Sequence, residues 1–193
     1  MNASPTAKTA ILFFVILGVI ATTFGVTVWR HEDNSRVQFR LTDQTGQVIT
    51  QNHLGGRHLM VFFGFTSCVD ICPVQMAKLT GVMAELDRTG HGTRVTPVFI
   101  SVDPERDTPE KVAAWLEHFD DRFVGLTGSR AALEGAADSF RTLLEDLPAE
   151  TPEGYQITHS SMTFIVDPFG RIVDFLPEAA DHVAMAEKIR EIV

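Results

Sequence analysis

Two cysteines, the only ones in the chain, lie between a predicted buried strand and the beginning of a predicted helix. The apolar run 58–63 indicates a fully buried strand. Pro73 is typical of the first turn of a helix, where a missing N–H costs no hydrogen bond. Cys68 and Cys72 therefore lie where free N–H groups and the helix dipole favour thiolate over thiol. The position predicts redox chemistry or the binding of a soft metal ion.

Strands and helices alternate along residues 37–193, beginning with an N-terminal β-hairpin over 37–50 whose turn is at 43–46. The last two strands form a second hairpin around the turn 167–170. This order predicts an α/β fold with a mixed sheet and helices on both faces. Residues 145–156 are rich in proline and acidic residues and predict an exposed loop. Besides 58–63, we expect strands at 95–102, 123–126, 142–144, 160–166 and 171–176, and helices at 73–88, 109–119, 130–140 and 180–193.

The N-terminal segment 10–28 is nineteen residues long and carries no charge. That length approaches the ~20 apolar residues that span a bilayer. A cleaved signal peptide has a shorter apolar core of ~7–15 residues and a small-residue cleavage site, which this segment lacks. We predict a single membrane anchor at 10–29, a cytoplasmic N-terminus at 1–9, a linker at 30–36 and a domain at 37–193. A bacterial inner membrane with the domain in the periplasm, where disulfides persist, fits best.

The formal net charge is −9. Residues 1–35 carry Lys8 and Arg30 against Glu32 and Asp33, so the whole negative charge belongs to the rest of the chain. An acidic domain repels phosphate backbones, which excludes nucleic acid as an expected partner. A cationic protein surface or a metal cation is the more plausible partner.

Two sulfurs select a soft metal ion such as Cu(I), zinc or an iron–sulfur cluster. Zinc requires four ligands and a cluster four cysteines, so Cu(I) with one further donor fits two cysteines better. His159 precedes a predicted strand and follows the flexible segment 154–158, which makes it the histidine best placed to reach the sulfurs. Spacing alone leaves its role as a ligand open. The other six histidines have the pattern of surface or packing residues: His31, His53, His58, His91, His118 and His182.

Several other side chains near the cysteines have two interpretations. Asp103, Arg106 and Asp107 either form a network beside the cysteines or cap the following helix. Met76 is either a core residue or, less plausibly, a metal ligand. Asp70 is either a solvated loop residue or one that tunes the site.

Several separated motifs occur together in this chain: Phe63 to Pro73, Ser101 to Pro109, Gly125 to Gly128, Tyr155, His159-Ser160 and Asp167-Pro168-x-Gly170. With these motifs the chain resembles the Sco/SenC family of membrane-anchored copper chaperones over about 37–193. Two positions depart from the family pattern. Val69 stands where the family has proline, which bears on the stiffness of the loop, and Thr158 stands where the family has aspartate, which bears on histidine orientation.

The resemblance implies a thioredoxin-like fold in which Cys68, Cys72 and His159 bind copper, as Cu(I) with Cu(II) as a second candidate. It further implies delivery of copper to the binuclear copper site of a cytochrome c oxidase, which makes the oxidase copper subunit the expected partner, beside other periplasmic copper or thiol carriers. Such a chaperone is not an enzyme. Oxidation of the two cysteines to a disulfide would remove both sulfur ligands, so metal loading is linked to redox state.

The competing function is a thiol–disulfide oxidoreductase acting on cysteines of the oxidase or of other periplasmic proteins. The usual redox motif has two residues between its cysteines and needs no distant histidine, whereas three residues separate Cys68 and Cys72. A thioredoxin-fold peroxidase is disfavoured because Phe65 stands where such enzymes have threonine or serine. A structural disulfide on an anchored binding module is the remaining alternative.

Overall fold

The computed structural model describes residues 15–22, 36–147, 156–159 and 162–193. The chain divides into two compact units, residues 1–35 and 36–193. In the first unit, residues 15–22 are helical and exposed. Among the described residues, no helix has the length and apolar character that crossing a membrane requires. The anchor predicted at 10–29 lies mostly outside the described residues and stays a prediction.

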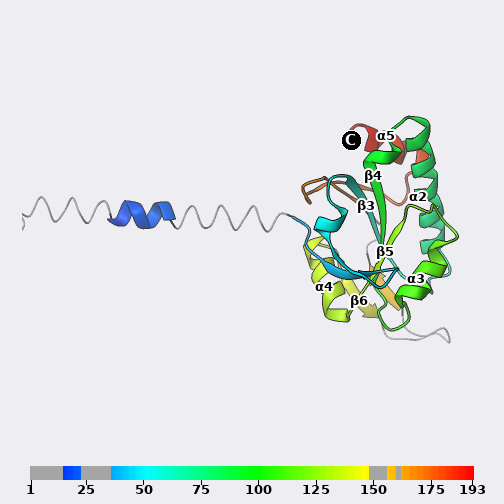
Figure 1. The fold of residues 1–193 in the computed structure, drawn as a ribbon, viewed down its shortest axis with the longest axis horizontal. Helices are drawn as coiled ribbons and strands as arrows, with labels where there is room; N and C mark the ends of the chain where they lie inside the picture. Colours follow the sequence, from blue (N-terminus) through cyan, green and yellow to red (C-terminus); the bar gives the residue numbers. More distant parts are fainter. Residues whose placement is uncertain (1–14, 23–35, 148–155, 160–161) are drawn as a thin grey trace, which may run out of the picture. The chain divides into compact units, whose positions relative to one another are not determined.

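The second unit is built on a seven-stranded mixed sheet (Figure 1). Its order is β2-β1-β5-β4-β3-β8-β9, in which β3 runs parallel to β4 and β4 parallel to β5, while the other pairs are antiparallel. The predicted hairpins at both ends of the domain are confirmed as β1–β2 and β8–β9. The strands are β1 (Arg40–Asp43), β2 (Val48–Thr50), β3 (His58–Gly64), β4 (Val95–Ser101), β5 (Val124–Thr127), β8 (Thr163–Val166) and β9 (Ile172–Leu176).

Helices cover both faces of the sheet, as the alternating pattern predicts (Figure 1). Buried residues of α2, α3 and α5 belong to one hydrophobic cluster, and those of α4 to the other. The α-helices are α2 (Ile71–Arg88), α3 (Pro109–Leu116), α4 (Arg130–Ser139) and α5 (His182–Arg190), and two 3-10 turns are η1 (Gln51–Leu54) and η2 (Gly92–Arg94).

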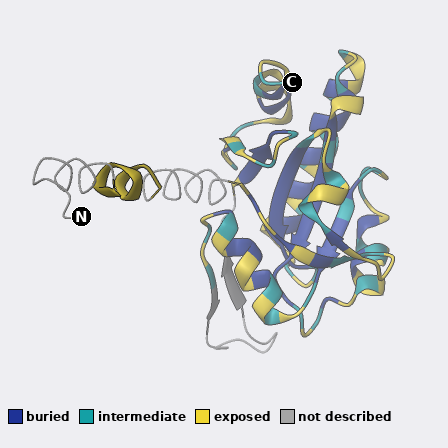
Figure 2. Cartoon of the chain, turned by 60° about the vertical axis from the view of Figure 1, so that its left-hand side comes forward, coloured by how far each residue is buried: buried dark blue, intermediate teal, exposed yellow. Residues whose placement is uncertain are grey.

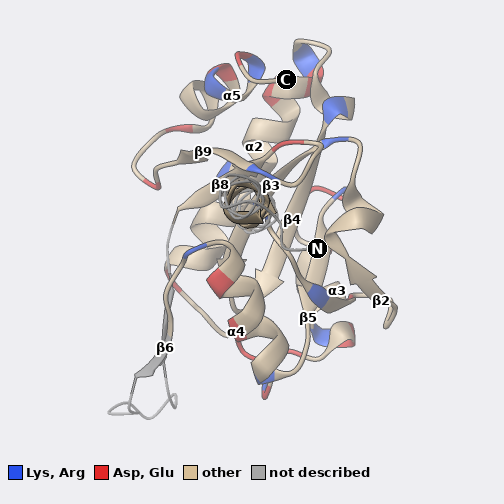
Figure 3. Ribbon diagram, turned by 90° about the vertical axis from the view of Figure 1, so that its left-hand side faces the viewer, with Lys and Arg blue, Asp and Glu red and all other residues tan. Residues whose placement is uncertain are grey.

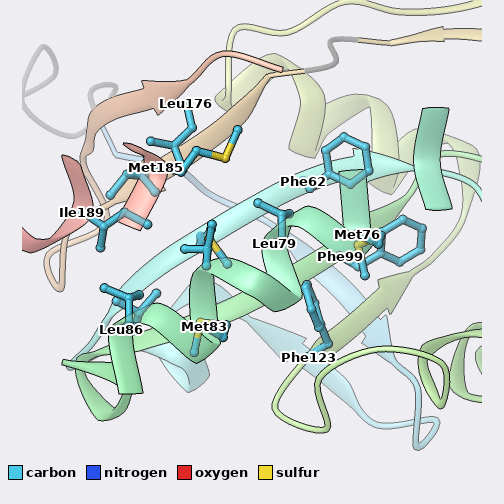
Figure 4. Packing of buried hydrophobic residues seen from close by; sticks show 14 of the residues in the cluster. Phe62, Met76, Leu79, Met83, Leu86, Phe99, Phe123, Leu176, Met185 and Ile189 are labelled. Atoms are coloured by element: carbon cyan, nitrogen blue, oxygen red, sulfur yellow. The ribbon is translucent and has the colours of Figure 1, made fainter. Parts of the chain in front are cut away.

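Strand β3 separates the two hydrophobic clusters because successive side chains point to opposite faces. Met60 and Phe62 pack in the cluster beneath α2 and α5, where Figure 4 shows Phe62. Val61 and Phe63 pack in the opposite cluster, against α4. The buried residues therefore line the centre of the domain (Figure 2), and Lys, Arg, Asp and Glu are interspersed over its helices and loops (Figure 3).

Polar side chains fix the starts of three helices. The side chain of Thr108 accepts a hydrogen bond from the backbone of Lys111 at the start of α3, as its N-cap position predicts. Ser129 and Asp181 cap α4 and α5 in the same way. Pro97 lies early in β4, before pairing with β5 begins at Val98, so its missing N–H is tolerated.

A separate two-stranded sheet differs from the expectation. Strand β6 (Leu144–Leu147) extends into the predicted loop, and β7 (Gln156–His159) replaces the predicted flexible segment before the histidine. Each strand is only four residues long, and two such segments are stable only by pairing with each other. Pairing of this kind leaves little trace in either segment alone.

Candidate metal centre

The cysteine turn joins β3, which ends at Gly64, to α2, which begins at Ile71. Cys68 is partly buried, Cys72 is fully buried, and both are free thiols. The backbone N–H of Cys68 donates to the carbonyl of Phe65 at 3.2 Å, which tightens the turn. The helix starts two residues earlier than predicted, and Pro73 still lies in the first turn, where N–H groups have no helical partner.

The environment of Cys72 corrects the expectation that the helix N-terminus favours its thiolate. Burial raises the pKa of Cys72 far above its usual value, and the neighbouring Cys68 and Asp107 raise it further, outweighing a hydrogen bond with the backbone of Phe65 that lowers it. A thiol in this state is a poor nucleophile at neutral pH. A metal cation bound here would offset the effect of burial, because it would replace the proton and stabilise the thiolate.

Gly64 is required beside the sulfur because the space around it is filled. A Cβ at this position would lie 3.2 Å from the Cys72 Sγ and 2.9 Å from the Phe99 ring. Real Cβ atoms rarely approach other atoms that closely, so a larger residue would displace the sulfur or the ring. The close fit holds Cys72 against the end of β3.

The carboxylate of Asp107 stabilises the cysteine turn through hydrogen bonds. Its side chain is fully buried and accepts hydrogen bonds from the backbone N–H and hydroxyl of Thr66, at 2.8 and 2.5 Å, and from the hydroxyl of Ser101 at 2.6 Å. Lys111 forms an ion pair with Asp107 at 3.5 Å and donates to the hydroxyl of Ser67 at 3.2 Å. Thr66 in this turn is therefore tied directly to one buried carboxylate, and Ser67 is tied to it through Lys111.

A second carboxylate stabilises the loop that carries Asp107. Asp103 is fully buried, pairs with the guanidinium of Arg106, and accepts the backbone N–H of Asp107 on its own carbonyl at 2.9 Å. Arg106 in turn lies 5.6 Å over the ring of Phe65, the residue that follows β3. The interpretation of Asp103, Arg106 and Asp107 as a network beside the cysteines is confirmed. They do not cap the next helix, because Thr108 is the N-cap residue of α3.

His159 is placed only by its backbone. It is the last residue of β7 and is paired with Leu144 of β6, while its side chain lies outside the described residues. Thr163, four residues later, pairs with Phe62 near the end of β3. Four residues span at most ~14 Å, so the backbone of His159 lies within that distance of Thr163, which is itself paired with the strand that leads to the cysteines. Its role as a ligand stays a prediction.

The other candidate ligands have different places in the fold. Met76 is fully buried in the core with Phe62 and Phe99, which confirms the structural interpretation (Figure 4). Asp70 is the N-cap residue of α2, is exposed, and makes no capping hydrogen bond with its side chain. Within the described ranges, no group of three or more His, Cys, Asp or Glu residues could hold a metal ion.

Comparison with known proteins decides the family. The SCO1/SenC family model matches residues 29–193. The chain belongs to the SCO1/SenC family. A SCO2-like protein of Rickettsia felis is 36% identical over 144 residues, covering 73% of this chain and 69% of that protein. The copper-bound crystal structure of ScoI from Arabidopsis thaliana superposes with a TM-score of 0.77 and 32% identity, covering 82% of this chain and 98% of the other.

One further SCO1/SenC structure carries a functional description. BsSco is described as having a disulfide switch and as a member of the Sco family of cytochrome c oxidase assembly proteins. It superposes with a TM-score of 0.65 and 25% identity, covering 81% of this chain and 92% of that chain. These comparisons support the expected thioredoxin-like fold, and Sco proteins of this fold have been solved with copper bound.

Three apolar side chains close to the cysteines in the sequence of this SCO1/SenC chain are exposed to solvent. Val69, between the two cysteines in the sequence, is 92% exposed, Val74 is 61% exposed, and Ile71 is 36% exposed. Apolar side chains exposed together in this way are typical of a surface that meets another protein. Nothing in the sequence pattern alone distinguishes them from buried helix positions.

The residues that hold the cysteine turn were not predicted from the sequence. Thr66 and Ser101 lie inside the matching motifs, but hydroxyl residues at strand ends have no characteristic spacing. The pattern of α2 does indicate that Gln75 is unusual. Gln75 is a polar residue on the same helix face as Leu79 and Val82, which are both fully buried.

Proposed function

We propose that this protein is a copper chaperone that binds copper through Cys68, Cys72 and His159 and delivers it to the binuclear copper site of a cytochrome c oxidase. The observation that carries the proposal is the pair of free cysteines at the start of α2, held by a buried network, in a chain of the SCO1/SenC family. The copper-bound Arabidopsis ScoI and the oxidase-assembly description of BsSco support it.

Two thiolates and an imidazole suit Cu(I), which accepts soft ligands at low coordination number. A three-coordinate site leaves room for a thiolate of the receiving protein to enter before one of the original ligands leaves. Copper can then pass by ligand exchange without release into solution. The exposed Val69, Ile71 and Val74 offer the receiving protein an apolar surface beside the sulfurs. Delivery of cargo in this way involves no catalytic turnover, so we do not expect enzyme activity.

Replacing His159 with alanine should weaken Cu(I) binding by the reduced protein more than tenfold, because changes even to residues behind the ligands of metal sites cost ~10–100-fold in affinity. Chelator competition measures the affinity. His118→Ala is the matched control, because His118 is exposed on the turn after α3 and its ring bonds only the carbonyl of Trp115 among the described contacts. Equal affinity for His159→Ala and the parent protein would remove His159 from the proposed ligand set.

We also propose that residues 10–29 anchor the chain in a bacterial inner membrane with the domain in the periplasm. The support is the uncharged segment 10–28 and its length, close to that of a bilayer span. In cells, the full chain should stay with the membrane fraction after alkaline carbonate extraction, whereas a chain beginning at Arg36 should be released. Extraction of the full chain into the soluble fraction would contradict the anchor.

A further inference from the structure

Gln75 is a polar residue in an apolar layer. It lies three residues after Cys72 on α2 and is only 1% exposed. The surrounding cluster between α2 and the sheet consists of hydrophobic side chains, among them Phe62 and Met76. Burying an amide in such a layer costs free energy unless its polar atoms are hydrogen-bonded.

Within the part of the chain that the structure describes, the Gln75 amide has one of its two polar atoms hydrogen-bonded. Its Nε2 donates to the hydroxyl of Thr163 at 3.2 Å. Its Oε1 is buried and has no hydrogen-bond partner among the described residues. An apolar side chain of similar shape would avoid the cost of the unpaired oxygen. Packing alone therefore does not account for a glutamine at this position.

The hydrogen bond from Gln75 to Thr163 connects the two segments that carry the proposed copper ligands. Cys72 and Gln75 are three residues apart and so lie on the same side of α2. Thr163 is fully buried, begins β8, and follows His159 by four residues. Because β8 pairs with β3, the bond fixes the start of α2 against the point where the chain leaves His159 and enters the sheet.

We propose that Gln75 is a positioning residue of the copper site, which sets the distance between Cys72 and the segment that carries His159. This inference rests on the proposed function, since it assigns Gln75 a role through His159. Residues that orient the ligands of a metal site contribute to affinity although they do not touch the metal. Gln75 thus retains a buried polar group at a cost in stability and in return aligns the ligands.

Replacing Gln75 with leucine should lower the Cu(I) affinity of the reduced protein by about tenfold or more, with one copper still bound. The melting temperature of the copper-free protein should change little, because removal of the buried amide offsets the loss of the hydrogen bond to the buried Thr163 hydroxyl. Chelator competition and calorimetry measure the two quantities. Met76→Leu, on the next residue of α2, is the matched control and should leave the affinity unchanged. Unchanged affinity in Gln75→Leu would overturn the inference.

Two further variants separate positioning from general packing. Gln75→Glu keeps an acceptor for the Thr163 hydroxyl and should recover most of the lost affinity. Thr163→Val removes the same hydrogen bond from the sheet and should lower affinity as Gln75→Leu does, so it carries the test if the leucine variant does not fold. A lower melting temperature with unchanged affinity in both Gln75→Leu and Thr163→Val would assign the pair to the core and overturn the inference.

The route through His159 is tested by combining Gln75→Leu with His159→Ala. If Gln75 acts through His159, the double variant should bind Cu(I) no more weakly than His159→Ala alone. Additive losses would overturn this route. If His159→Ala alone leaves affinity unchanged, both the proposed third ligand and this inference fail. If His159→Ala weakens binding and Gln75→Leu does not, only the inference on Gln75 fails.

Discussion

Replacing Cys72 with serine should abolish Cu(I) binding by the reduced protein, a loss larger than the ~10–100-fold typical of changes behind the ligands. A hydroxyl is a hard, weakly acidic donor and does not replace a thiolate for a soft ion. Cys72 is fully buried against Gly64, so the serine fits the space and the fold should persist. Chelator competition measures the affinity, and far-UV circular dichroism checks the fold.

Cys68→Ser should cause a loss of the same order, since both sulfurs belong to the site. Met76→Leu removes the sulfur that lies one helical turn beyond Cys72 and is the control, because Met76 is fully buried in the core. Parent-like affinity in either cysteine variant would show that copper binds elsewhere. A cell carrying both cysteine variants should also fail to assemble its oxidase, and full assembly would argue against the proposed role.

Replacing Asp107 with alanine should lower the free energy of unfolding by about 3 kcal/mol, because three donors lose their acceptor and each unpaired buried polar group costs ~1–3 kcal/mol. The donors are the N–H and hydroxyl of Thr66 and the hydroxyl of Ser101. The melting temperature should fall by ~6–12 °C for a domain of this size. Calorimetry of the reduced, copper-free protein measures the change.

The Asp107 change should also weaken copper binding, because Thr66 and Ser67 lie in the cysteine turn and are held by Asp107 and by its ion-pair partner Lys111. Asp107→Asn keeps one acceptor oxygen and should give a smaller loss of stability. Glu105→Ala, at an exposed position of the same loop, is the control and should change stability by no more than ~0.5 kcal/mol. An Asp107→Ala protein as stable as this control would contradict the anchoring role of the carboxylate.

The main sheet was predictable because its signals are local. The apolar run of β3 and the turn 167–170 each predict an element without reference to the rest of the chain. The pairing of β6 with β7 was not predictable, because it joins two short segments separated by a loop. The family resemblance, which rests on several separated motifs, is confirmed by the family match over residues 29–193.

The two cysteines of the candidate site could be predicted from the sequence, whereas the surroundings of their sulfurs could not. Two cysteines before a helix indicate metal or redox chemistry from sequence alone. The sequence predicts a lowered pKa for Cys72 because Pro73 reveals the helix start, whereas the structure raises that pKa by burial. The burial was not predictable, because the contacts of the sulfur with Gly64 and Phe99 depend on the packing of distant strands. Gln75 and Thr163 meet across the helix–sheet interface for the same reason.

X-ray absorption spectroscopy of the reduced protein loaded with one Cu(I) tests the central claim most directly. The proposed site predicts two sulfur neighbours at about 2.3 Å and one nitrogen neighbour at about 2.0 Å, near the zinc values. The nitrogen contribution should disappear in His159→Ala while both sulfurs remain. A spectrum with two sulfurs and no nitrogen in the parent protein, or one that His159→Ala leaves unchanged, would contradict the account.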